Sequence, residues 1–428
     1  MDNITPLKKR MKKKRRIIFR LSDFNRLSFP ILLNVWEQAG IDTEFEILLR
    51  SEPLTASEIH SGDVVLFSFM TSVIPLIHQE IQAIKASAVP DVLLVGGGPH
   101  ITGEQELADK IGLDTLFIGA AERTFLQFGH DLLDNRPIPC IYRSPTPEDN
   151  KNNLAEIAAF NRYIPVSRYT ETIPPLEIMR GCYWQCNYCS TPLTKVQFRE
   201  LASIEMFLQE MKKRGHIRVN VISPSAMEYG APAGRKIALD KIETLINLIA
   251  SYQFRFIEYG IFPSEVRPDT VTAQGMALLK KYVINKSITI GAQSAMDQRL
   301  KELRRGHGVA EICQAIQIAN DNGFLVNLDF IVGYPDETSA ERQQLVEFIK
   351  SLTRRFRIRT HLHHFIPLAG SPYAFRFPGF MPETEKEPLV KLKNAGITSD
   401  GWVTNEKQAH DYFGWLHHYF PDYYARYT

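Results

Sequence analysis

The chain has 428 residues, of which 44% are hydrophobic and 23% are charged. These values are those of a globular protein with roughly two or three domains, and they exclude a disulfide-stapled miniprotein, a collagen-like chain and a disordered polypeptide. The formal net charge of +2 hides an asymmetry, because residues 1–16 carry eight basic groups and one acidic group, which leaves the rest of the chain mildly acidic.

The basic arm, residues 1–16, has two interpretations. Clustered Lys and Arg side chains could contact RNA, DNA or anionic lipid. The arm contains no aromatic residue to stack on bases, so a solvated, flexible leader is favoured. No apolar core with a small-residue cleavage site follows it, and no stretch reaches the roughly 18 apolar residues of a membrane span. We therefore expect a cytoplasmic protein that does not enter the membrane, with the arm as the sole support for nucleic-acid binding.

Residues 17–145 alternate short apolar runs with amphipathic segments. We expect strands at 17–21, 44–49, 64–69, 92–96 and 115–119, and helices at 31–39, 76–88, 104–111 and 125–133. Continuous apolar strands separated by helices are typical of a parallel sheet that is covered on both faces. The sequence predicts an α/β fold that begins with a doubly wound, Rossmann-like domain, followed by a Pro- and Asn-rich linker over residues 146–173.

From Pro174 the alternation resumes over residues 174–375. Strands are expected at 176–180, 219–223, 256–262, 287–293, 325–332 and 358–366. Gly323 stands where a glycine ends the helix from Val309, and Thr338 with Glu341 fits a capping box. Successive βα units predict a partial (βα)6 barrel whose site lies at the carboxyl ends of the strands. Residues 376–428 are expected to form a short helical cover on this barrel.

Three of the five cysteines lie within eight residues, in a C-x3-C-x2-C pattern after the first barrel strand. They are Cys182, Cys186 and Cys189. Three thiolates on one tight loop can converge on one metal centre, and soft sulfur ligands favour zinc or an iron–sulfur cluster. Structural zinc takes four ligands, and no fourth Cys or His follows Cys189 at finger spacing, so zinc is the less favoured alternative.

On this motif and its place in a βα barrel, the chain resembles the radical S-adenosylmethionine (SAM) enzymes. The resemblance implies that the three cysteines hold a 4Fe–4S cluster with one open iron that chelates SAM. The reduced cluster then cleaves SAM to a 5′-deoxyadenosyl radical, and the electron comes from a donor such as flavodoxin or ferredoxin. Tyr188, before the last cysteine, fits the adenine side of SAM.

Further segments strengthen the resemblance, and they are similar to the radical SAM domains of methylthiotransferases and cobalamin-dependent relatives. Segment 221–230 stands where the family meets the SAM amino group, although the common Gly-Gly-Glu is absent. Segments 291–307 and 329–338 would supply the remaining SAM contacts. The resemblance places Ser223 and Ser225 at the amino group, Gln293 and Ser294 at the ribose, Arg305 at the carboxylate, and Val332, Gly333 and Tyr334 at the adenine.

Titratable residues at two other strand ends are candidates for catalysis. His361, His363 and His364 lie on the sixth strand, where alternation puts His361 and His363 on one face. That pair could bind substrate or move a proton, or be a solvated histidine cluster. Glu265 is a similar candidate, with Arg267 as an ion-pair partner. The sequence does not identify the catalytic residue or the substrate.

A glycine-rich turn, Gly96-Gly97-Gly98, follows a strand and opens a helix in the N-terminal domain. The final glycine of G-x-G-x-x-G is missing, so nicotinamide binding is disfavoured. Placed before a radical SAM domain, this domain resembles the cobalamin-binding domain of such enzymes. The resemblance assigns cobalamin to Thr71, Ser72, Gly96, Gly97, Gly98, Thr102 and Glu122. The D-x-H-x-x-G motif of a cobalt-ligating histidine is absent, and a domain that has lost the cofactor is the alternative.

The cysteine count separates the functional hypotheses. The methylthiotransferases resemble the barrel, but their N-terminal domain supplies three more cysteines for a second cluster, and here that region has only Cys140. Cys313 is a small residue on a helix face. The leading hypothesis is a cobalamin-dependent radical SAM methyltransferase or an enzyme of a related radical transformation. The alternatives are a cobalamin-independent radical SAM enzyme that modifies RNA or a small metabolite and, least favoured, a metal-stabilised binding protein.

Overall fold

A computed structural model describes residues 14–22, 25, 28–145, 154–232 and 237–428. Most of the basic arm therefore lies outside the described residues, as do residues 146–153 of the expected linker. Arg16, counted with the arm in the sequence analysis, is instead the first residue of strand β1 (Arg16–Arg20) and donates to the backbone oxygen of Glu58. No helix within the described ranges is long and apolar enough to span a membrane.

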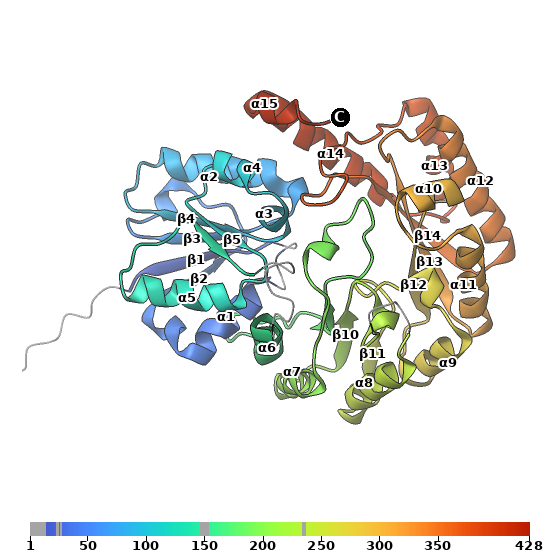
Figure 1. Ribbon diagram of the computed structural model, residues 1–428, viewed down its shortest axis with the longest axis horizontal. Helices are drawn as coiled ribbons and strands as arrows, with labels where there is room; N and C mark the ends of the chain where they lie inside the picture. Colours follow the sequence, from blue (N-terminus) through green and yellow to red (C-terminus); the bar gives the residue numbers. More distant parts are fainter. Residues whose placement is uncertain (1–13, 23–24, 26–27, 146–153, 233–236) are drawn as a thin grey trace, which may run out of the picture.

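The N-terminal half is the expected doubly wound domain, with six parallel strands in the order β2-β1-β3-β4-β5-β6 (Figure 1). The further strands are β2 (Glu46–Arg50), β3 (Val64–Ser68), β4 (Leu93–Gly97), β5 (Thr115–Ile118) and β6 (Ile141–Arg143). Every residue of the central strand β3 is buried, as a parallel sheet covered on both faces requires. Sequence periodicity located all of these strands except β6, which pairs with β5 at the edge.

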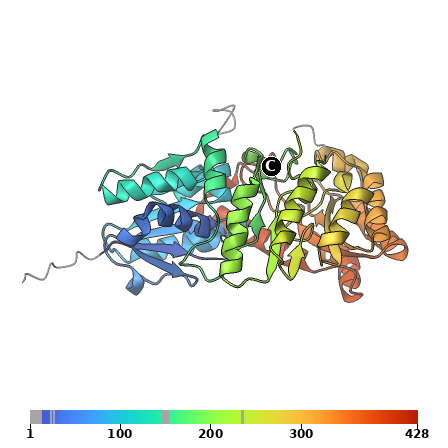
Figure 2. The same cartoon turned by 90° about the horizontal axis from the view of Figure 1, so that it is seen from below.

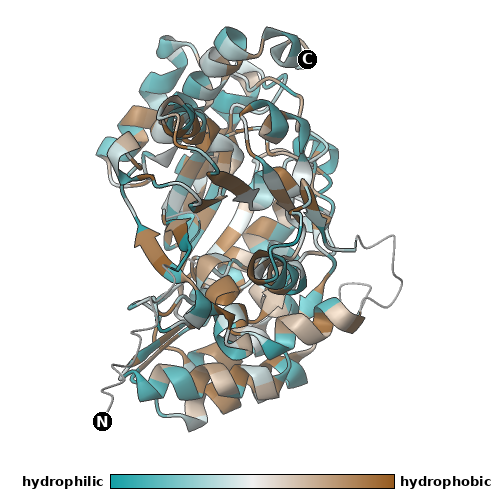
Figure 3. Cartoon of the chain, turned by 90° about the vertical axis from the view of Figure 1, so that its left-hand side faces the viewer, coloured by the Kyte–Doolittle hydropathy of each residue, from teal (hydrophilic) through white to brown (hydrophobic). Residues whose placement is uncertain are grey.

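Helices cover both faces of this sheet (Figure 2). They are α1 (Ser28–Ala39), α2 (Ile74–Ala86), α3 (Pro99–Gly103), α4 (Glu106–Lys110) and α5 (Glu122–Leu133). Trp36 of α1 stacks on Phe125 of α5 on one face, and Ile81 of α2 packs with Leu107 of α4 on the other. Seen from the N-terminal side, the helices interleave hydrophilic and hydrophobic residues, as their position between sheet and solvent requires (Figure 3).

Part of the expected linker is a helix, α6 (Leu154–Arg162). It packs against α5, and Arg123 of α5 lies 2.9 Å from Glu156. Phe160 of α6 lies under the guanidinium group of Arg180, 4.6 Å from the ring centroid. This helix therefore belongs to the junction of the two halves.

The second half is the expected partial barrel, built from two three-stranded parallel sheets. One contains β7 (Leu176–Glu177), β10 (Arg218–Ile222) and β11 (Phe256–Glu258), and the other β12 (Ser287–Gln293), β13 (Leu325–Val332) and β14 (Ile358–His364). The predicted strand 256–262 ends at Glu258, because the chain turns at Gly260, whose φ is 72°. Residues 264–266 then bridge the two sheets through the pairing of Val266 with Ile290.

Helices surround the outside of this barrel (Figure 1). They are α7 (Leu201–Lys213), α8 (Leu239–Ser251), α9 (Ala273–Tyr282), α10 (Asp297–Glu302), α11 (Val309–Asp321) and α12 (Ser339–Arg355). Gly323 follows the end of α11 with φ of 84°, and Thr338 and Glu341 form the expected capping box of α12. A short antiparallel pair, β8 (Met179–Arg180) and β9 (Gln197–Phe198), holds the ends of the cysteine loop together.

The C-terminal segment is helical, as predicted, but it covers more than the barrel. It consists of α13 (Glu383–Asn394), α14 (Gly401–Tyr419) and α15 (Pro421–Tyr424). Trp402, at the start of α14, belongs to the barrel core, whereas Trp415 belongs to the core of the N-terminal domain. The prediction that residues 376–428 cover the barrel is therefore wrong for the aromatic residues from 412 onward, which pack on the N-terminal domain. Helix α14 spans both halves instead (Figure 1), because it packs on β14 of the barrel near its start and on α2 of the N-terminal domain near its end.

Candidate functional site between the sheet edge and the cysteine loop

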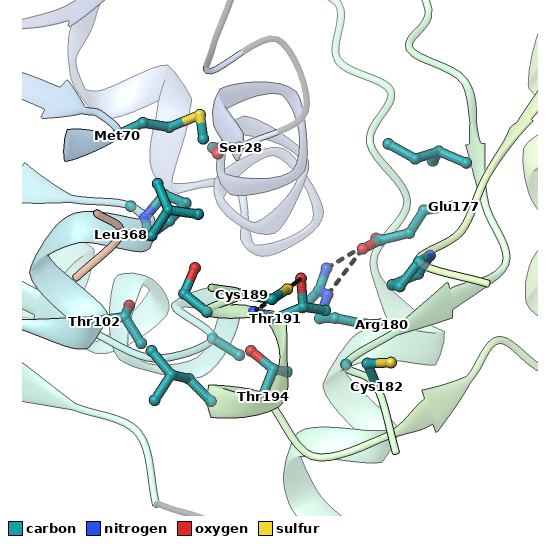
Figure 4. Close-up of a pocket in the computed structure, with 18 of the residues that line it drawn as sticks. Ser28, Met70, Thr102, Glu177, Arg180, Cys182, Cys189, Thr191, Thr194 and Leu368 are labelled. Atoms are coloured by element: carbon teal, nitrogen blue, oxygen red, sulfur yellow. Dashed lines mark hydrogen bonds and ion pairs between the residues drawn. The ribbon is translucent and has the colours of Figure 1, made fainter. Parts of the chain in front are cut away.

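One cavity of about 810 Å³ lies where the carboxyl ends of the N-terminal strands face the mouth of the barrel. Its N-terminal wall includes Ser28, Met70 and Thr102, and its barrel wall includes Arg180 and Cys189 (Figure 4). Parallel strands place their carboxyl ends at one edge, which is where open α/β sheets and βα barrels bind ligands. Both halves therefore contribute their binding edges to the same space.

The three clustered cysteines all line this cavity. Nη1 of Arg305 lies 3.4 Å from Sγ of Cys186, and the backbone N–H of Thr191 donates to Sγ of Cys189 over 3.4 Å. Burial raises the pKa of the Cys182 thiol to about 11, so that thiol is protonated at neutral pH without a bound cation. The loop thus combines one buried and two half-buried cysteines with donors that stabilise thiolate charge.

This donor set fits an iron–sulfur cluster better than a single metal ion. Among the described residues, no group of three His, Cys, Asp or Glu side chains lies close enough to hold one metal ion. A cluster binds each cysteine through a different iron, so its ligands must stand farther apart than those of one ion. Three thiols distributed along one wall of a cavity meet that requirement.

Three polar side chains converge above Gly291 on β12. A Cβ atom at this glycine would lie 2.7 Å from Nε2 of Gln293, 3.3 Å from Nη2 of Arg305 and 3.4 Å from Oε2 of Glu265. Nη2 of Arg305 also donates to the Gly291 oxygen over 2.7 Å. Gln293 has φ of 69° at a register shift of the strand, a strained conformation of the kind that concentrates at functional sites. The absence of a side chain at Gly291 makes room for this convergence.

The cavity contains some of the residues expected to contact SAM and excludes others. Tyr188, Ser223, Gln293 and Arg305 line it, and the hydroxyl of Tyr188 lies 3.0 Å from Nη1 of Arg305. The other expected residues lie outside the cavity lining; they are Ser225, Ser294, Val332, Gly333 and Tyr334. The Ser294 hydroxyl accepts from the backbone N–H of Met296, and Val332 is in the barrel core, so local packing accounts for both. The assigned contacts with SAM stay predictions.

The glycine-rich turn lines the opposite wall, together with Thr102 and Glu122. Gly98 has φ of 99°, and a Cβ there would lie 2.7 Å from the backbone nitrogen of Phe69, so only glycine fits. A Cβ on Gly97 would lie 3.6 Å from Cβ of Phe117, an ordinary van der Waals contact, so a side chain fits at this cavity-lining position where it does not fit at Gly98. Thr102 accepts from the backbone N–H of Gly119 over 3.1 Å and joins two loops of this edge.

Thr71 and Ser72 do not line the large cavity. The Thr71 hydroxyl lies 3.1 Å from Nδ1 of His100 and accepts from the backbone N–H of Ala369 over 3.3 Å. Burial lowers the pKa of His100 to about 3, so this imidazole is neutral. Thr71 therefore connects the N-terminal domain to the chain that follows β14, and a direct contact with a ligand in the large cavity is not supported.

Sequence analysis missed the charged residues that join the two halves. Arg180 of β8 lies 2.7 Å from Glu122 of α5 and 2.9 Å from Glu177 of β7. Burial alone would raise the pKa of Glu177, but the Arg180 guanidinium outweighs it and holds that pKa below its usual value. Glu122, expected at cobalamin, is engaged by Arg180. The sequence did contain one signal for this junction, because the charged residues Glu177 and Arg180 flank the apolar strand residues before Cys182.

The three candidates for catalysis have different positions. Glu265 and His363 line the cavity, whereas His361 does not. Nδ1 of His361 lies 3.0 Å from Oδ1 of Asp329, and Asp329 does line the cavity. The expected alternation of β14 holds, since His364 is buried on the opposite face, where its ring stacks on Phe380. Arg267 contacts Asp269 and the Trp184 ring, not Glu265.

Comparison with known proteins identifies the barrel. The model of the radical SAM superfamily matches residues 176–349. The threonylcarbamoyladenosine tRNA methylthiotransferase MtaB of Thermotoga maritima is 24% identical over 222 residues, which are 51% of this chain and 49% of that protein. The ribosomal protein uS12 methylthiotransferase RimO of Chloroherpeton thalassium is 24% identical over 241 residues, 54% of this chain and 52% of that one. This chain therefore spans about half the length of the curated relatives it matches.

Two solved structures share the arrangement of both halves. The radical SAM methyltransferase TsrM of Kitasatospora setae aligns with a TM-score of 0.60 and 15% identity, over 85% of this chain and 77% of that chain. The radical SAM enzyme OxsB aligns with a TM-score of 0.53 and 12% identity, over 79% of this chain and 52% of that chain. The family implies a 4Fe–4S cluster and SAM, which the cavity thiols fit. Residues 176–349 of this chain are a radical SAM domain.

Proposed function

We propose that this protein is a cobalamin-dependent radical SAM enzyme that transfers a methyl group to a substrate, or carries out a related radical transformation, in the cavity between its two halves. The observation that carries the proposal is the continuity of that cavity, because one space contacts both the cysteine loop and the Gly96–Gly98 turn. A cofactor on the N-terminal wall and a cluster on the barrel wall would face the same substrate.

The comparisons support this assignment through the fold. The TsrM and OxsB structures contain bound cobalamin, and both align with the N-terminal domain as well as the barrel. When bound, the cluster with SAM supplies a radical and cobalamin supplies a methyl group. The protein's part is to position these groups. Cys182, Cys186 and Cys189 would hold the cluster, and the part of the cavity that Gly97 lines would admit the cobalamin ring.

The residues around the cavity also support a site that keeps water away from reactive groups. The walls combine apolar side chains such as Phe29, Phe117 and Ile331 with a few charged ones. Arg305 is 7% exposed and presents its positive charge to Cys186 and the cavity. A radical held in such a space meets substrate and apolar surface before solvent.

A second candidate is a cobalamin-independent radical SAM enzyme that modifies RNA or a small metabolite. The curated relatives that support it are named as methylthiotransferases of tRNA or of a ribosomal protein. Their second cluster needs cysteines that the N-terminal half of this chain does not supply, since Cys140 is the one cysteine before Cys182. Within this second candidate, methylthio transfer is therefore less well supported than another radical modification of RNA or of a small metabolite.

An anaerobic reconstitution tests the proposal. The protein is loaded with iron and sulfide, incubated with hydroxocobalamin and desalted, and its absorption spectrum is recorded. It is then reduced in the presence of SAM, with dithionite or with flavodoxin or ferredoxin as donor, and 5′-deoxyadenosine is measured. We expect a cluster spectrum, retained cobalamin and nucleoside release by the wild-type protein.

Two cysteine variants make the test specific. Cys186→Ala should abolish nucleoside release, whereas Cys140→Ala, at an exposed cysteine outside the cavity lining, should leave it unchanged. Equal release from Cys186→Ala and the wild-type protein would refute the mechanism. A cluster without retained cobalamin would favour the second candidate.

A further inference from the structure

A chain of three titratable side chains leads from the cavity to a histidine that is partly exposed to solvent. Glu265 lies on the segment that bridges the two barrel sheets, and its carboxyl group faces the cavity. Its Oε2 atom lies beside Gly291, 3.4 Å from a Cβ built there, and Gly291 is paired in register with Asp329 of β13, so the two carboxyl groups are neighbours. Asp329 in turn lies 3.0 Å from Nδ1 of His361 on β14. The order along the chain is therefore Glu265, Asp329, His361.

Strand register explains why these groups meet. Asp329 and His361 are directly paired positions of the parallel strands β13 and β14, so their side chains leave the sheet on the same face. Glu265 is half-buried at the cavity, the Asp329 side chain is 8% exposed and the His361 side chain is 39% exposed. The buried Asp329 carboxyl group therefore connects a cavity-lining carboxyl group to a histidine that contacts solvent.

The protonation states suit proton transfer near neutral pH. Burial and the neighbouring Asp329 carboxylate raise the pKa of Glu265 to about 7, because two adjacent carboxylates cannot both ionise readily. The hydrogen bond to Asp329 raises the pKa of His361. The other charged or titratable groups that face this chain are Arg305 and Tyr188 beside Glu265, and Arg359 beside His361.

A second observation indicates that a ligand completes this part of the cavity. Arg305 is 7% exposed and lines the cavity beside Glu265, yet its Nε has no hydrogen-bond partner among the described residues. A buried guanidinium N–H without a partner is costly unless a bound acceptor satisfies it. The SAM carboxylate expected at Arg305 would supply this acceptor, and Glu265, which lies beside Arg305 at Gly291, would then border the part of the cavity left for the substrate.

We propose that Glu265, Asp329 and His361 form a proton relay, in which Glu265 exchanges a proton with the substrate and His361 exchanges it with solvent. The inference rests on the proposed function, which makes this cavity the substrate site. The substrate class it indicates is a compound that carries an acidic N–H or O–H next to its reacting carbon. The catalytic residue is Glu265, and Asp329 and His361 are positioning residues.

The step balances without any redox partner. The Glu265 carboxylate takes the proton of the substrate N–H or O–H, and the bonding electrons stay on the substrate nitrogen or oxygen. The proton then passes from Glu265 through the Asp329 carboxyl group to Nδ1 of His361, while Nε2 of His361 releases a proton to water. The reverse sequence protonates the substrate.

The test follows the relay protons in the full chain. The imidazole signals of ¹⁵N-labelled histidine are titrated by NMR, with His361→Gln used to assign the His361 signals, and the protonated carboxyl C=O band is recorded by infrared spectroscopy at pH 6 and pH 9. We expect Asp329→Asn to lower the pKa of His361 by about one unit. We expect Glu265→Gln to remove a protonated carboxyl band that the wild-type protein shows at pH 6 and loses at pH 9.

His363→Gln is the matched control, because His363 lines the same cavity but lies opposite Ile331 in the strand register. It should leave both signals unchanged.

Burial also raises the pKa of Glu337 to about 7, so the carboxyl signal is read as the difference between the wild-type protein and Glu265→Gln. A His361 pKa that is insensitive to Asp329→Asn, or a carboxyl signal that Glu265→Gln does not diminish, would overturn the relay. If Asp329→Asn fails to fold, His361→Gln answers the same question. In that variant the pH at which the Glu265 carboxyl band disappears should differ from the wild-type value. Neither readout needs cluster, cobalamin or turnover, so failure of the relay and failure of the proposed function are distinguishable.

Discussion

Nη1 of Arg180 lies 2.7 Å from Oε1 of Glu122, and this ion pair joins the two halves of the molecule at the wall of the cavity. Arg180 stands two residues before the first cluster cysteine, and Glu122 is the first residue of α5. The contact therefore fixes the distance between the sheet edge and the cysteine loop. The shared site depends on it.

Arg180→Ala should destabilise the protein by about 3 kcal/mol, because it leaves Glu122 and Glu177 as unpaired carboxylates with little access to water. The free energy of unfolding in urea, measured on the cofactor-free chain, checks this. Lys213→Ala is the control, since Lys213 and Glu210 form an exposed pair for which the loss should be below about 1 kcal/mol. Equal losses in the two variants would contradict a role for Arg180 at the junction.

Gly291→Ala should weaken SAM binding about tenfold, which corresponds to about 1.4 kcal/mol. The new methyl group would displace the Gln293 amide and press on Arg305 and Glu265. Equilibrium dialysis with SAM on the reconstituted protein measures the effect. Gly414→Ala serves as control, because that glycine lies in helix α14 with open space around it, and alanine should leave SAM affinity unchanged. Unaltered affinity in Gly291→Ala would show that this convergence does not bind SAM.

Glu265→Gln should make the protein more stable than the wild type at high pH and not at low pH. The folded-state pKa of Glu265, about 7, lies above its ordinary value of 4.5, so the native state holds the proton more tightly and stability falls as pH rises through that window. The variant removes this loss, which is at most about 3 kcal/mol. Urea unfolding at pH 4.5 and pH 8 should show a stability difference between variant and wild type that grows with pH. A constant difference would contradict the raised pKa.

Trp415→Ala should cost about 3 to 5 kcal/mol, because it empties a buried site where α14 meets the N-terminal domain. Nε1 of Trp415 donates to Nδ1 of His78 over 3.0 Å. Trp415→Phe keeps most of the ring and should cost about 1 to 2 kcal/mol, chiefly for the lost hydrogen bond. Thermal unfolding followed by circular dichroism ranks the variants. If Trp415→Ala and Trp415→Phe unfold together, the ring does not hold the two halves.

Sequence periodicity predicted most of the fold for a physical reason. Strands such as β3 and β13 lie at the centre of their sheets and are mostly buried, so they appear in the sequence as apolar runs. Strand β6 escaped because three residues at an edge, with an exposed Ile141, carry no such pattern. The aromatic end of α14 packs on the N-terminal domain and not on the barrel. Its apolar residues indicate that one helix face is buried, but they do not indicate which domain buries it.

The candidate site was predicted in part. The cysteine loop and the glycine turn are local in sequence, so spacing alone locates them. Asp329 and Arg180 were missed because their roles come from partners far along the chain, His361 and Glu122. Ser294 follows β12 and Gly333 follows β13, two strands that end at the cavity, but neither residue lines it. The path of the backbone after each strand determines which residues reach the cavity, and the sequence does not reveal that path.

The amount of cobalamin that the reconstituted protein retains tests the central claim, that the sheet edge and the cysteine loop share one site. Absorbance after anaerobic desalting should show about one cobalamin per wild-type chain. Gly97→Leu, whose Cβ would make only ordinary contacts and whose side chain would occupy part of the cavity that Gly97 lines, should retain little cobalamin while its iron content stays at the wild-type level. Full iron with no cobalamin in the wild-type protein, or undiminished cobalamin in Gly97→Leu, would contradict the account.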